Sequence, residues 1–446
     1  MADLPLSRLS EVMGGEYRGP SDARACRAVI DSREAGSGCL FFALAGSRTD
    51  GHRFVEEVLS VGGAAVVSRD RGGAPVIVVE DVEKALARAG AWARDRISCP
   101  VIGLSGSSGK TTTRRMLELA LGVRYDVAAT EGNRNNQLGL PLTLLNLPDA
   151  PDVVVLELGM NHSGELRDLC EVAGPTDSVI TNIGLAHVEF LGSREGIAGA
   201  KAELLEGTAK GGFCVIPAGE PILDSAAAAA GLKTVRTGTG GDRWLEPVEG
   251  GAVLQPGAHP IRLGVPGWHN LENALTAVTA AELMGVDPKD SIEAVSKHSG
   301  MPGRSAMITA GALRIMDESY NSNPDSAVAC LKTLAEVAAG SGVAVLGDML
   351  ELGGRSPQLH RMVLEAADGL GLNRIILLGE LFAAEAKTTS STETLIAADC
   401  ADAAKLAAEA LPNGGTVLVK GSRGLRLERV VDLLASNSDP VGSVQR

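Results

Sequence analysis

Residues 101–113 read Val101-Ile102-Gly103-Leu104-Ser105-Gly106-Ser107-Ser108-Gly109-Lys110-Thr111-Thr112-Thr113. The apolar run predicts a strand, the part rich in Gly and Ser predicts a loop, and Lys110 opens a segment with helical spacing. Backbone N–H groups in such a loop and at a helix N-terminus bind phosphate oxygens. In this pattern Lys110 reaches the terminal phosphates, and the hydroxyl of Thr111 holds Mg²⁺. The stretch therefore predicts that the chain binds a nucleoside triphosphate.

The loop departs from the full G-x-x-x-x-G-K-[ST] pattern. Leu104 stands where that pattern requires a glycine, so the loop has the tighter form G-x-x-G-K-T-T. The alternative interpretation is a surface loop that is rich in Gly and Ser by chance. The strand before it and the helix after it favour a phosphate loop. We expect the whole loop to contact the nucleotide, through Gly106, Ser107, Ser108, Gly109, Lys110, Thr111 and Thr112.

The composition is that of a globular protein, with 446 residues, 45% of them apolar and 22% charged. This length predicts about three domains. A formal net charge of −14 offers no basic footprint, which excludes nucleic-acid binding. No apolar run reaches the ~18 residues of a membrane span, and no signal peptide is evident. Seven scattered cysteines without a C-x-x-C pair argue against disulfides and predict a cytoplasmic protein.

Apolar runs alternate with helical patterns, which indicates an α/β fold with mostly parallel sheets. We expect three domains, over residues 1–98, 99–302 and 303–446. Residues 233–265 contain short strand-like pieces with many Gly and Pro, which predicts a small antiparallel addition to the central domain. Strands are expected at 39–44, 64–68, 75–79, 153–158, 178–183, 213–216, 312–316, 343–346, 374–378 and 416–419. Helices are expected at 54–59, 82–96, 163–172, 195–210, 270–285 and 398–410.

Three side chains of the central domain are candidates for catalysis. Glu157 ends an apolar strand, where ligands bind in open α/β sheets, so it is a natural Mg²⁺ ligand unless it faces solvent. His187 follows the end of the next strand and could complete a metal shell, although a lone His is more often structural. Lys201 lies on an expected helix and, taken alone, reads as a solvated surface lysine.

Further polar segments leave two interpretations open. The amides of Asn133, Asn135 and Asn136 suit either substrate contacts or a plain turn. Asn270 is either a helix N-cap or a purine contact. Charged residues at the ends of elements in the third domain could clamp a phosphate, hold a ribose or bind a carboxylate, or could be solvated charges at a domain edge. They are Arg304, Asp317, Lys420 and Arg423.

Together these segments resemble the Mur ligase superfamily over nearly the whole chain. The phosphate loop and His269-Asn270 are similar to the superfamily in general, and three further motifs resemble its dipeptide-adding member. These motifs are Tyr320-Asn321-Ser322-Asn323-Pro324, Gly347-Asp348-Met349-Leu350-Glu351-Leu352-Gly353 and Lys420-Gly421-Ser422-Arg423. Other matching segments are Asp31-Ser32-Arg33, Gly38–Leu44, Thr130–Pro141, Glu157–His162 and Ala186–Ser193.

The resemblance implies an N-terminal domain that binds a UDP-sugar, a central ATPase and a Rossmann-like C-terminal domain. It implies Mg²⁺ ligands at Thr111, Glu157 and His187, and it makes Lys201 a lysine carbamoylated by CO₂, which would add a further ligand. Nucleotide contacts are implied at Asn270, Asn273, Arg304 and Asp317. Substrate contacts are expected at Ser32, Arg33, Asn133, Asn135, Asn136, Tyr320, Asn321, Asn323, Lys420, Ser422 and Arg423.

The implied activity is an ATP-dependent amide ligase of peptidoglycan synthesis. It would join D-alanyl-D-alanine to UDP-N-acetylmuramoyl-tripeptide (UDP-MurNAc-tripeptide) through an acyl phosphate. Its catalytic residues would be Lys110, Glu157, His187, Lys201 and Arg304. Its only expected partners are these small-molecule substrates and ATP. The protein is expected to be a monomer. Two rival interpretations remain: another amide ligase of the superfamily, such as one resembling folylpolyglutamate synthase, and a P-loop switch that binds nucleotide without ligation.

Overall fold

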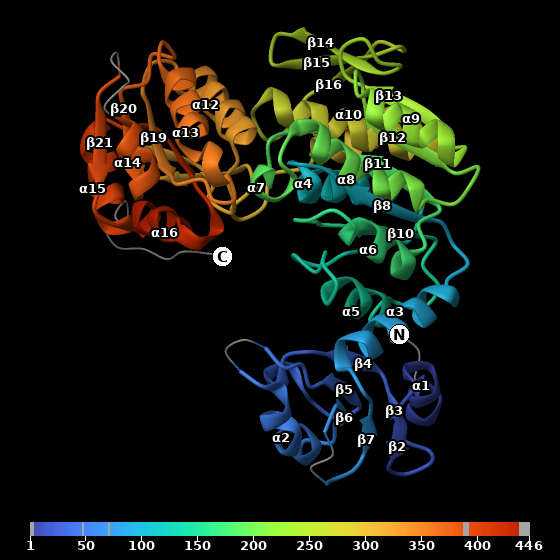
Figure 1. The fold of residues 1–446 in the computed structure, drawn as a ribbon. Helices are drawn as coiled ribbons and strands as arrows, with labels where there is room; N and C mark the ends of the chain where they lie inside the picture. Colours follow the sequence, from blue (N-terminus) through green and yellow to red (C-terminus); the bar gives the residue numbers. More distant parts are fainter. Residues whose placement is uncertain (1–3, 47–48, 70–71, 387–391, 437–446) are drawn as a thin grey trace.

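The computed structural model describes residues 4–46, 49–69, 72–386 and 392–436. Three α/β units follow one another along the chain, and each is built on its own sheet (Figure 1). The central unit lies between the other two, and its helices α7 (Val188–Leu191) and α10 (Trp268–Leu283) contact the C-terminal unit (Figure 1). The predicted α/β class with mostly parallel sheets is confirmed.

The N-terminal unit has a five-stranded sheet in the order β2-β7-β6-β5-β4. Strands β4 to β7 run parallel, and β2 pairs antiparallel with β7. The strands are β2 (Glu16–Arg18), β4 (Arg27–Val29), β5 (Cys39–Phe42), β6 (Ala64–Val67) and β7 (Val76–Val78), with a separate pair β1 (Leu4–Pro5) and β3 (Arg24–Ala25). The helices are α1 (Leu6–Met13), α2 (Val55–Ser60) and α3 (Val82–Asp95).

The central unit has a six-stranded parallel sheet in the order β13-β12-β11-β8-β10-β9. Its strands are β8 (Val101–Ser105), β9 (Val127–Ala129), β10 (Val153–Glu157), β11 (Asp177–Ile180), β12 (Phe213–Pro217) and β13 (Lys233–Thr237). Its helices are α4 (Lys110–Leu121), α5 (Gly139–Leu145), α6 (Glu165–Ala173), α7 (Val188–Leu191), α8 (Arg194–Glu206), α9 (Pro221–Ala230), α10 (Trp268–Leu283) and α11 (Pro288–Ser296).

Both faces of the central sheet are covered by helices. Alternate residues of a strand point to opposite faces, so an apolar run of this kind builds two cores. Val153 and Val155 of β10 pack in the core that α4 and α10 complete. Val154 and Leu156 pack in the core that α6 and α8 complete. This double burial fixes the sheet, and with it the places where its strands end.

The expected antiparallel addition is present, but it is shorter than predicted. Strands β14 (Trp244–Val248), β15 (Gly251–Gln255) and β16 (His259–Ile261) form a three-stranded antiparallel sheet. The first part of the predicted segment was wrong, because β13 joins the main sheet in parallel with β12. Its polar, half-exposed residues are those of an edge strand, which covers less apolar surface than an inner strand.

The C-terminal unit has a six-stranded sheet in the order β17-β18-β22-β19-β20-β21, parallel except at the edge strand β17. The strands are β17 (Ala306–Ala310), β18 (Leu313–Glu318), β19 (Gly342–Gly347), β20 (Arg374–Leu378), β21 (Thr394–Ala397) and β22 (Gly415–Lys420). The helices are α12 (Pro324–Ala338), α13 (Ser356–Ala367), α14 (Glu380–Glu385), α15 (Cys400–Ala410) and α16 (Glu428–Ser436).

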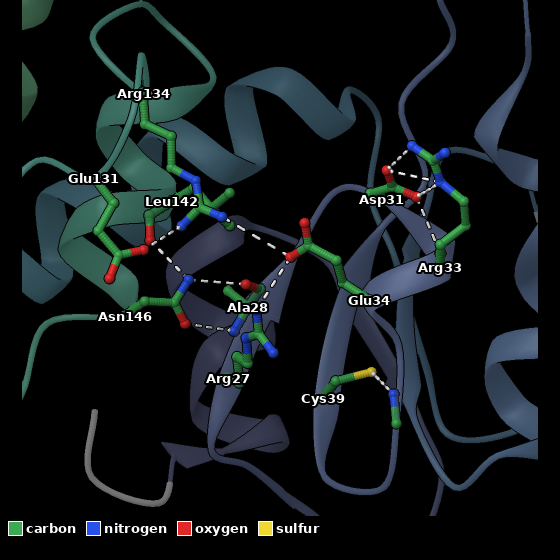
Figure 2. A network of polar contacts seen from close by, with 11 residues as sticks. Arg27, Ala28, Asp31, Arg33, Glu34, Cys39, Glu131, Arg134, Leu142 and Asn146 are labelled. Atoms are coloured by element: carbon green, nitrogen blue, oxygen red, sulfur yellow. Dashed lines mark hydrogen bonds and ion pairs between the residues drawn. The ribbon is translucent and has the colours of Figure 1, made fainter. Parts of the chain in front are cut away.

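Asn146, which ends α5, joins the central and N-terminal units. Its Nδ2 donates to the carbonyl oxygen of Ala28 at 2.8 Å, and its Oδ1 accepts from the Ala28 N–H at 2.9 Å (Figure 2). Ala28 belongs to β4, the edge of the N-terminal sheet. The amide therefore occupies the place that a further strand would take, and satisfies groups that an edge leaves unpaired.

Replacing Asn146 by alanine should loosen this edge. Leaving partly buried backbone groups unpaired costs about 1–3 kcal/mol, which corresponds to hydrogen exchange at the Ala28 amide about 5- to 150-fold faster. Exchange measured by mass spectrometry on the peptide that covers β4 tests this. Asn413→Ala, in an exposed turn of the C-terminal unit, is the matched control. Unchanged protection of β4 in Asn146→Ala would show that the amide does not hold the two units together.

Among the helices of the described residues, none has both the length and the apolar character that a bilayer crossing requires. The seven cysteines are all free.

Candidate active site

The phosphate loop leaves β8 and ends at α4, and two of its glycines are required by close contacts. Gly106 has φ 155° and Gly109, the N-cap of α4, has φ 72°. A Cβ on Gly106 would lie 1.8 Å from Thr181 Oγ1, and one on Gly109 would lie 2.3 Å from Asn273 Oδ1. Only glycine fits at these positions, so the loop keeps its N–H groups and the α4 N-terminus open to a ligand.

The segment after β11 holds the loop in shape. Asn182 accepts from Ser107 N at its carbonyl oxygen (3.1 Å) and from Ser108 N at Oδ1 (3.0 Å). Thr181 Oγ1 donates to the Ser108 carbonyl oxygen at 2.6 Å. The sequence analysis did not single out Thr181 and Asn182. It placed both inside the strand expected at 178–183, whereas β11 ends at Ile180 and leaves them in the loop that follows. Because the loop is braced on this side, its shape does not depend on a bound nucleotide.

Lys110 is the first residue of α4 and lines the cavity beside the loop. Its Nζ donates to the carbonyl oxygen of Gly106 at 2.9 Å. Burial lowers the pKa of Lys110, the nearby Glu157 carboxylate raises it, and Arg304 lowers it again. A bound phosphate would replace the carbonyl as the partner of this ammonium group.

Glu157 ends β10 next to the loop, and its side chain is buried rather than solvated. Its Oε1 accepts from Asn135 Nδ2 at 2.8 Å and from Thr111 Oγ1 at 3.2 Å. Its Oε2 is buried, lies 3.5 Å from Arg114 Nε, and has no hydrogen-bond partner among the described residues. Mg²⁺ prefers oxygen ligands. The unpaired carboxylate oxygen of Glu157 and the neighbouring Thr111 hydroxyl are ligands of this kind, so together they could hold the ion.

His187 and Lys201 differ in their surroundings. His187 has φ 60° and a side chain 16% exposed, and its Nδ1 lies 2.7 Å from Glu351 Oε2 of the C-terminal unit. Lys201 on α8 is only 2% exposed, which contradicts the surface lysine that its sequence context alone suggested. Burial lowers the pKa of Lys201 well below its usual range, and repulsion from Lys110 lowers it further.

A cavity of about 810 Å³ lies where the central and C-terminal units meet. The expected residues that line it are Ser107, Ser108, Gly109, Lys110, Thr112, Asn135, Asn136, Glu157, His187, Asn270, Asn273, Arg304, Tyr320, Asn321, Asn323 and Lys420. Those that do not line it are Gly106, Thr111, Lys201, Asp317, Ser32, Arg33, Asn133, Ser422 and Arg423. The cavity therefore unites the phosphate loop with polar motifs of the third unit, but not with the N-terminal candidates.

Asn270 does not cap its helix, so this interpretation was wrong. Helix α10 begins at Trp268 after Gly267, whose φ of 101° sets the start one turn earlier than a cap at Asn270 would require. The Asn270 side chain donates to the Pro266 carbonyl oxygen (2.7 Å) and to Ser305 Oγ (3.1 Å). Because Ser305 belongs to the next unit, this amide helps to join the two walls of the cavity.

Arg304 and Tyr320 form one corner of the cavity wall. The Arg304 guanidinium carbon lies 3.9 Å from the Tyr320 ring centroid, and that of Arg423 lies 5.5 Å from it. Such cation–π contacts hold a guanidinium group without consuming its N–H donors. Nearby, the buried Lys420 donates to the Asn321 carbonyl oxygen at 3.1 Å. The corner thus presents positive charge toward whatever enters the cavity.

Asp317 uses both carboxylate oxygens inside the protein. Oδ2 accepts from Gly303 N at 2.7 Å, and Oδ1 accepts from Ser319 Oγ at 2.6 Å and from Ser319 N at 3.2 Å. These bonds hold the turn that carries Arg304. Ser422 serves its own unit in a similar way, because its Oγ accepts from Leu350 N at 2.9 Å.

Three wall residues to which the sequence analysis gave no role lie close together. The ligand atoms of His269, Glu318 and Cys330 are all within 4.8 Å of one another. Burial lowers the pKa of His269 and raises the pKa of the Cys330 thiol to about 12. His269 Nδ1 has no hydrogen-bond partner among the described residues. Burial therefore favours the uncharged forms of the His269 ring and the Cys330 thiol, which lie beside the Glu318 carboxylate.

Ser32 and Arg33 lie on the N-terminal unit, in a short 3₁₀ turn that Asp31 caps. Arg33 Nε donates to Asp31 Oδ1 at 2.9 Å, and hydrogen bonds from Arg33 lower the pKa of Asp31 to about 2 (Figure 2). The neighbouring Glu34 lies 3.9 Å from Arg134 of the central unit. Arg33 is exposed, and Ser32 beside it is half-buried.

Comparison with known proteins decides the family. The UDP-N-acetylmuramoyl-tripeptide--D-alanyl-D-alanine ligase of Bacillus subtilis (strain 168) is 36% identical over 431 residues, which cover 92% of this chain and 93% of that protein. The chain belongs to the MurF family of Mur ligases. Two family models agree: the Mur ligase middle domain matches residues 104–281, and the Mur ligase, glutamate ligase domain matches residues 303–423.

Solved MurF structures share the fold over the whole chain. Crystal structure I of MurF from Acinetobacter baumannii has a TM-score of 0.89 at 30% identity and covers 98% of this chain and 99% of that one. The MurF ligase of Thermotoga maritima in complex with ADP has a TM-score of 0.82 at 30% identity, covering 92% of this chain and 97% of that one. The expected membership of the Mur ligases is confirmed.

Proposed function

We propose that this chain is the ATP-dependent ligase that joins D-Ala-D-Ala to UDP-MurNAc-tripeptide and releases ADP and phosphate. The product is the pentapeptide nucleotide that serves peptidoglycan synthesis. The observation that carries the proposal is a single cavity that joins a phosphate loop and a buried carboxylate to polar motifs of a second domain. The proposal is also supported by the 36% identity, over almost the full length, to the Bacillus subtilis protein named as a UDP-N-acetylmuramoyl-tripeptide--D-alanyl-D-alanine ligase.

The chemistry requires activation of an acid. A carboxylate resists attack by an amine, because it is negatively charged and oxide is a very poor leaving group. In the proposed first step the tripeptide carboxylate attacks the γ-phosphorus of ATP, and the bond to the β-phosphate oxygen breaks to leave ADP. Transfer of a phosphoryl group depends on positioning and on charge neutralisation. Lys110, the N-terminus of α4 and Arg304 would supply that neutralisation.

In the second step the amine of D-Ala-D-Ala attacks the acyl carbon. A tetrahedral intermediate forms, and phosphate leaves as the amide bond is completed. We assign the dipeptide to the C-terminal side of the cavity, because Lys420 lines that side and Arg423 lies behind it against Tyr320, which gives positive charge to pair with the dipeptide carboxylate. The remaining contacts of this side are proposed at Tyr320, Asn321, Asn323 and Ser422, and those of the tripeptide at Asn133, Asn135 and Asn136.

Mg²⁺ fits the side of the cavity where the buried Glu157 carboxylate lies beside the phosphate loop. Thr111 and Glu157 would hold it, with His187 as a further ligand, and the bound ion would neutralise charge on the phosphates. A carbamate on Lys201 would give this side another anionic oxygen ligand. Asn270 and Asn273 are proposed at the adenine, and Asp317 near the ribose. Ser32 and Arg33 are proposed at the UDP-sugar.

The domain limits 1–98, 99–302 and 303–446 remain our proposal, as do a monomeric state and a cytoplasmic location. The location is supported by seven free cysteines, which a reducing compartment preserves. It also suits an enzyme that consumes ATP.

Phosphate release in a coupled assay tests the proposed function. With ATP, Mg²⁺ and UDP-MurNAc-tripeptide, release should depend on D-Ala-D-Ala, and mass spectrometry should detect the pentapeptide nucleotide. Single amino acids in place of the dipeptide should give little release. Phosphate release that depends on a single amino acid, such as glutamate, instead of the dipeptide would indicate another amide ligase. ADP formation that ignores every acceptor would favour a nucleotide-binding switch and overturn the proposal.

A further inference from the structure

His187 of the central domain and Glu351 of the C-terminal domain are joined across the cavity mouth. Glu351 Oε2 lies 2.7 Å from His187 Nδ1, although the two residues are 164 positions apart in the sequence. Both line the cavity that holds Lys110 and Glu157. Glu351 belongs to the Gly347–Gly353 motif, to which the sequence analysis attached no role. The contact places a carboxylate of one domain on a proposed metal ligand of the other.

The backbone around this pair is arranged for close approach. His187 has φ 60° and Glu351 has φ 63°, so both adopt the left-handed conformation that side chains other than glycine rarely take. The Glu351 carbonyl oxygen also accepts from Glu189 N at 3.3 Å. A Cβ on Gly353 would lie 3.0 Å from Glu189 Cγ. Such local strain persists where surrounding structure maintains it, and it often marks functional positions.

A second bond fixes the same segment. Asp325 Oδ2, in the first turn of α12, accepts from Leu185 N at 2.7 Å. Gly184 permits this approach, because a Cβ there would lie 2.5 Å from the same carboxylate oxygen. The segment 184–189 is therefore held by the C-terminal domain at both of its ends. In Figure 1, α7, which directly follows His187, lies at the side of the central domain that faces the C-terminal domain.

The bond to Glu351 has a chemical consequence for the imidazole. A carboxylate accepts a hydrogen bond and cannot donate one, so the neutral ring must carry its proton on Nδ1. The lone pair then lies on Nε2, the nitrogen that remains free to bind a ligand. Carboxylates that hold a metal-binding histidine in this way set both its tautomer and its ring orientation.

We propose that Glu351 is a positioning residue that holds His187 as the Nδ1–H tautomer, so that docking of the C-terminal domain prepares this ligand. The inference rests on the role proposed above for His187. It predicts that the histidine is ready to bind a divalent cation only while the two domains are in contact, because its carboxylate partner belongs to the other domain.

Imidazole ¹⁵N chemical shifts of the metal-free protein provide the first test, since they distinguish the two tautomers. His187→Gln identifies the signals of His187 among the seven histidines. In the wild type His187 should show a protonated Nδ1 and an unprotonated Nε2. Glu351→Ala should give a mixture of tautomers, and Glu351→Gln, which keeps an acceptor oxygen, should restore most of the original pattern. Glu380→Ala, at an exposed position of the same domain, should change nothing.

Binding of Mn²⁺ in the presence of a non-hydrolysable ATP analogue provides the second test, by electron paramagnetic resonance. Loss of a carboxylate partner of this kind weakens metal binding by about 10- to 100-fold, and we expect this for Glu351→Ala. His187→Ala serves as the reference. If His187→Ala binds Mn²⁺ as the wild type does, the proposed ligand role of His187 fails. If His187→Ala weakens binding while Glu351→Ala changes neither binding nor the ¹⁵N shifts, the positioning role of Glu351 is overturned.

Discussion

Replacing Lys110 by alanine should lower kcat for amide formation by about 10²- to 10³-fold, the usual loss when one group that stabilises transition-state charge is removed. Lys110 is half-buried at the start of α4, with its Nζ 2.9 Å from the Gly106 carbonyl oxygen, so it is already held beside the phosphate loop. Charge that shifts toward the β-phosphate oxygen as the γ-phosphoryl group departs would have no other cation of the loop to neutralise it. Steady-state phosphate release at saturating ATP measures the loss.

The fold of Lys110→Ala should remain intact. Burial lowers the pKa of Lys110, and its charge repels Lys201, so the ammonium group costs the free protein energy and its loss should not lower the melting temperature. Arg115→Ala is the matched control, because this residue lies on the same helix, is exposed and pairs with Glu118. Arg115→Ala should keep wild-type activity. A Lys110→Ala enzyme with more than a tenth of wild-type kcat would contradict the assigned role.

Local patterns predicted the parts of the site that one segment builds alone. The phosphate loop is an example, because the strand, the glycines and the start of α4 all lie within residues 101–113. Glu157 is another, since a carboxylate at the end of an inner parallel strand must lie at the ligand-binding edge of the sheet. The same reasoning placed most strands of the three sheets to within two residues.

Errors arose where distant residues decide the outcome. Segment 233–237 is polar enough to suggest a separate hairpin, but it pairs with β12 and completes the main sheet. Asn270 suits an N-cap in isolation, yet Gly267 starts the helix earlier. Strands β1, β2, β3, β4, β9, β17 and β21 went unpredicted. All of them except β17 and β21 have three residues or fewer, which is too few to carry a clear alternation.

Contacts between domains have no signal in a single sequence. Nothing in the Gly347–Gly353 motif shows that Glu351 meets His187, because the pairing depends on how two separately folded sheets dock. Lys201 is the same kind of case. Its helix has a weakly one-sided pattern, since residues on several of its faces are buried, and only packing reveals that the lysine is among them. Single-sequence reasoning therefore found the residue types of the site but not the partners that tune them.

Lys201 should be as sensitive as Lys110. Its side chain is 2% exposed, and it has no hydrogen bond or ion pair within the described part of the chain. A buried ammonium group without a partner is costly, so burial together with Lys110 lowers the pKa of Lys201 well below its usual range and favours the neutral amine. A neutral amine can add to CO₂ and release a proton, which converts the side chain into a carbamate anion. The negative charge of a carbamate would attract Lys110, and its oxygens would offer a ligand to a cation.

The expected result for Lys201→Ala is a loss of about 10²- to 10³-fold in kcat, again the loss expected when one charge-stabilising group is removed from a closed site. Wild-type activity should fall in buffer freed of CO₂ and return when bicarbonate is added, whereas Lys201→Ala should respond to neither change. Lys210→Ala, an exposed lysine that follows the same helix, should behave as the wild type in both buffers.

Since CO₂ has no other role in the proposed reaction, a bicarbonate response that survives in Lys201→Ala would place the carbamate elsewhere. Full activity of Lys201→Ala would mean that the cation side of the cavity is complete with Thr111, Glu157 and His187.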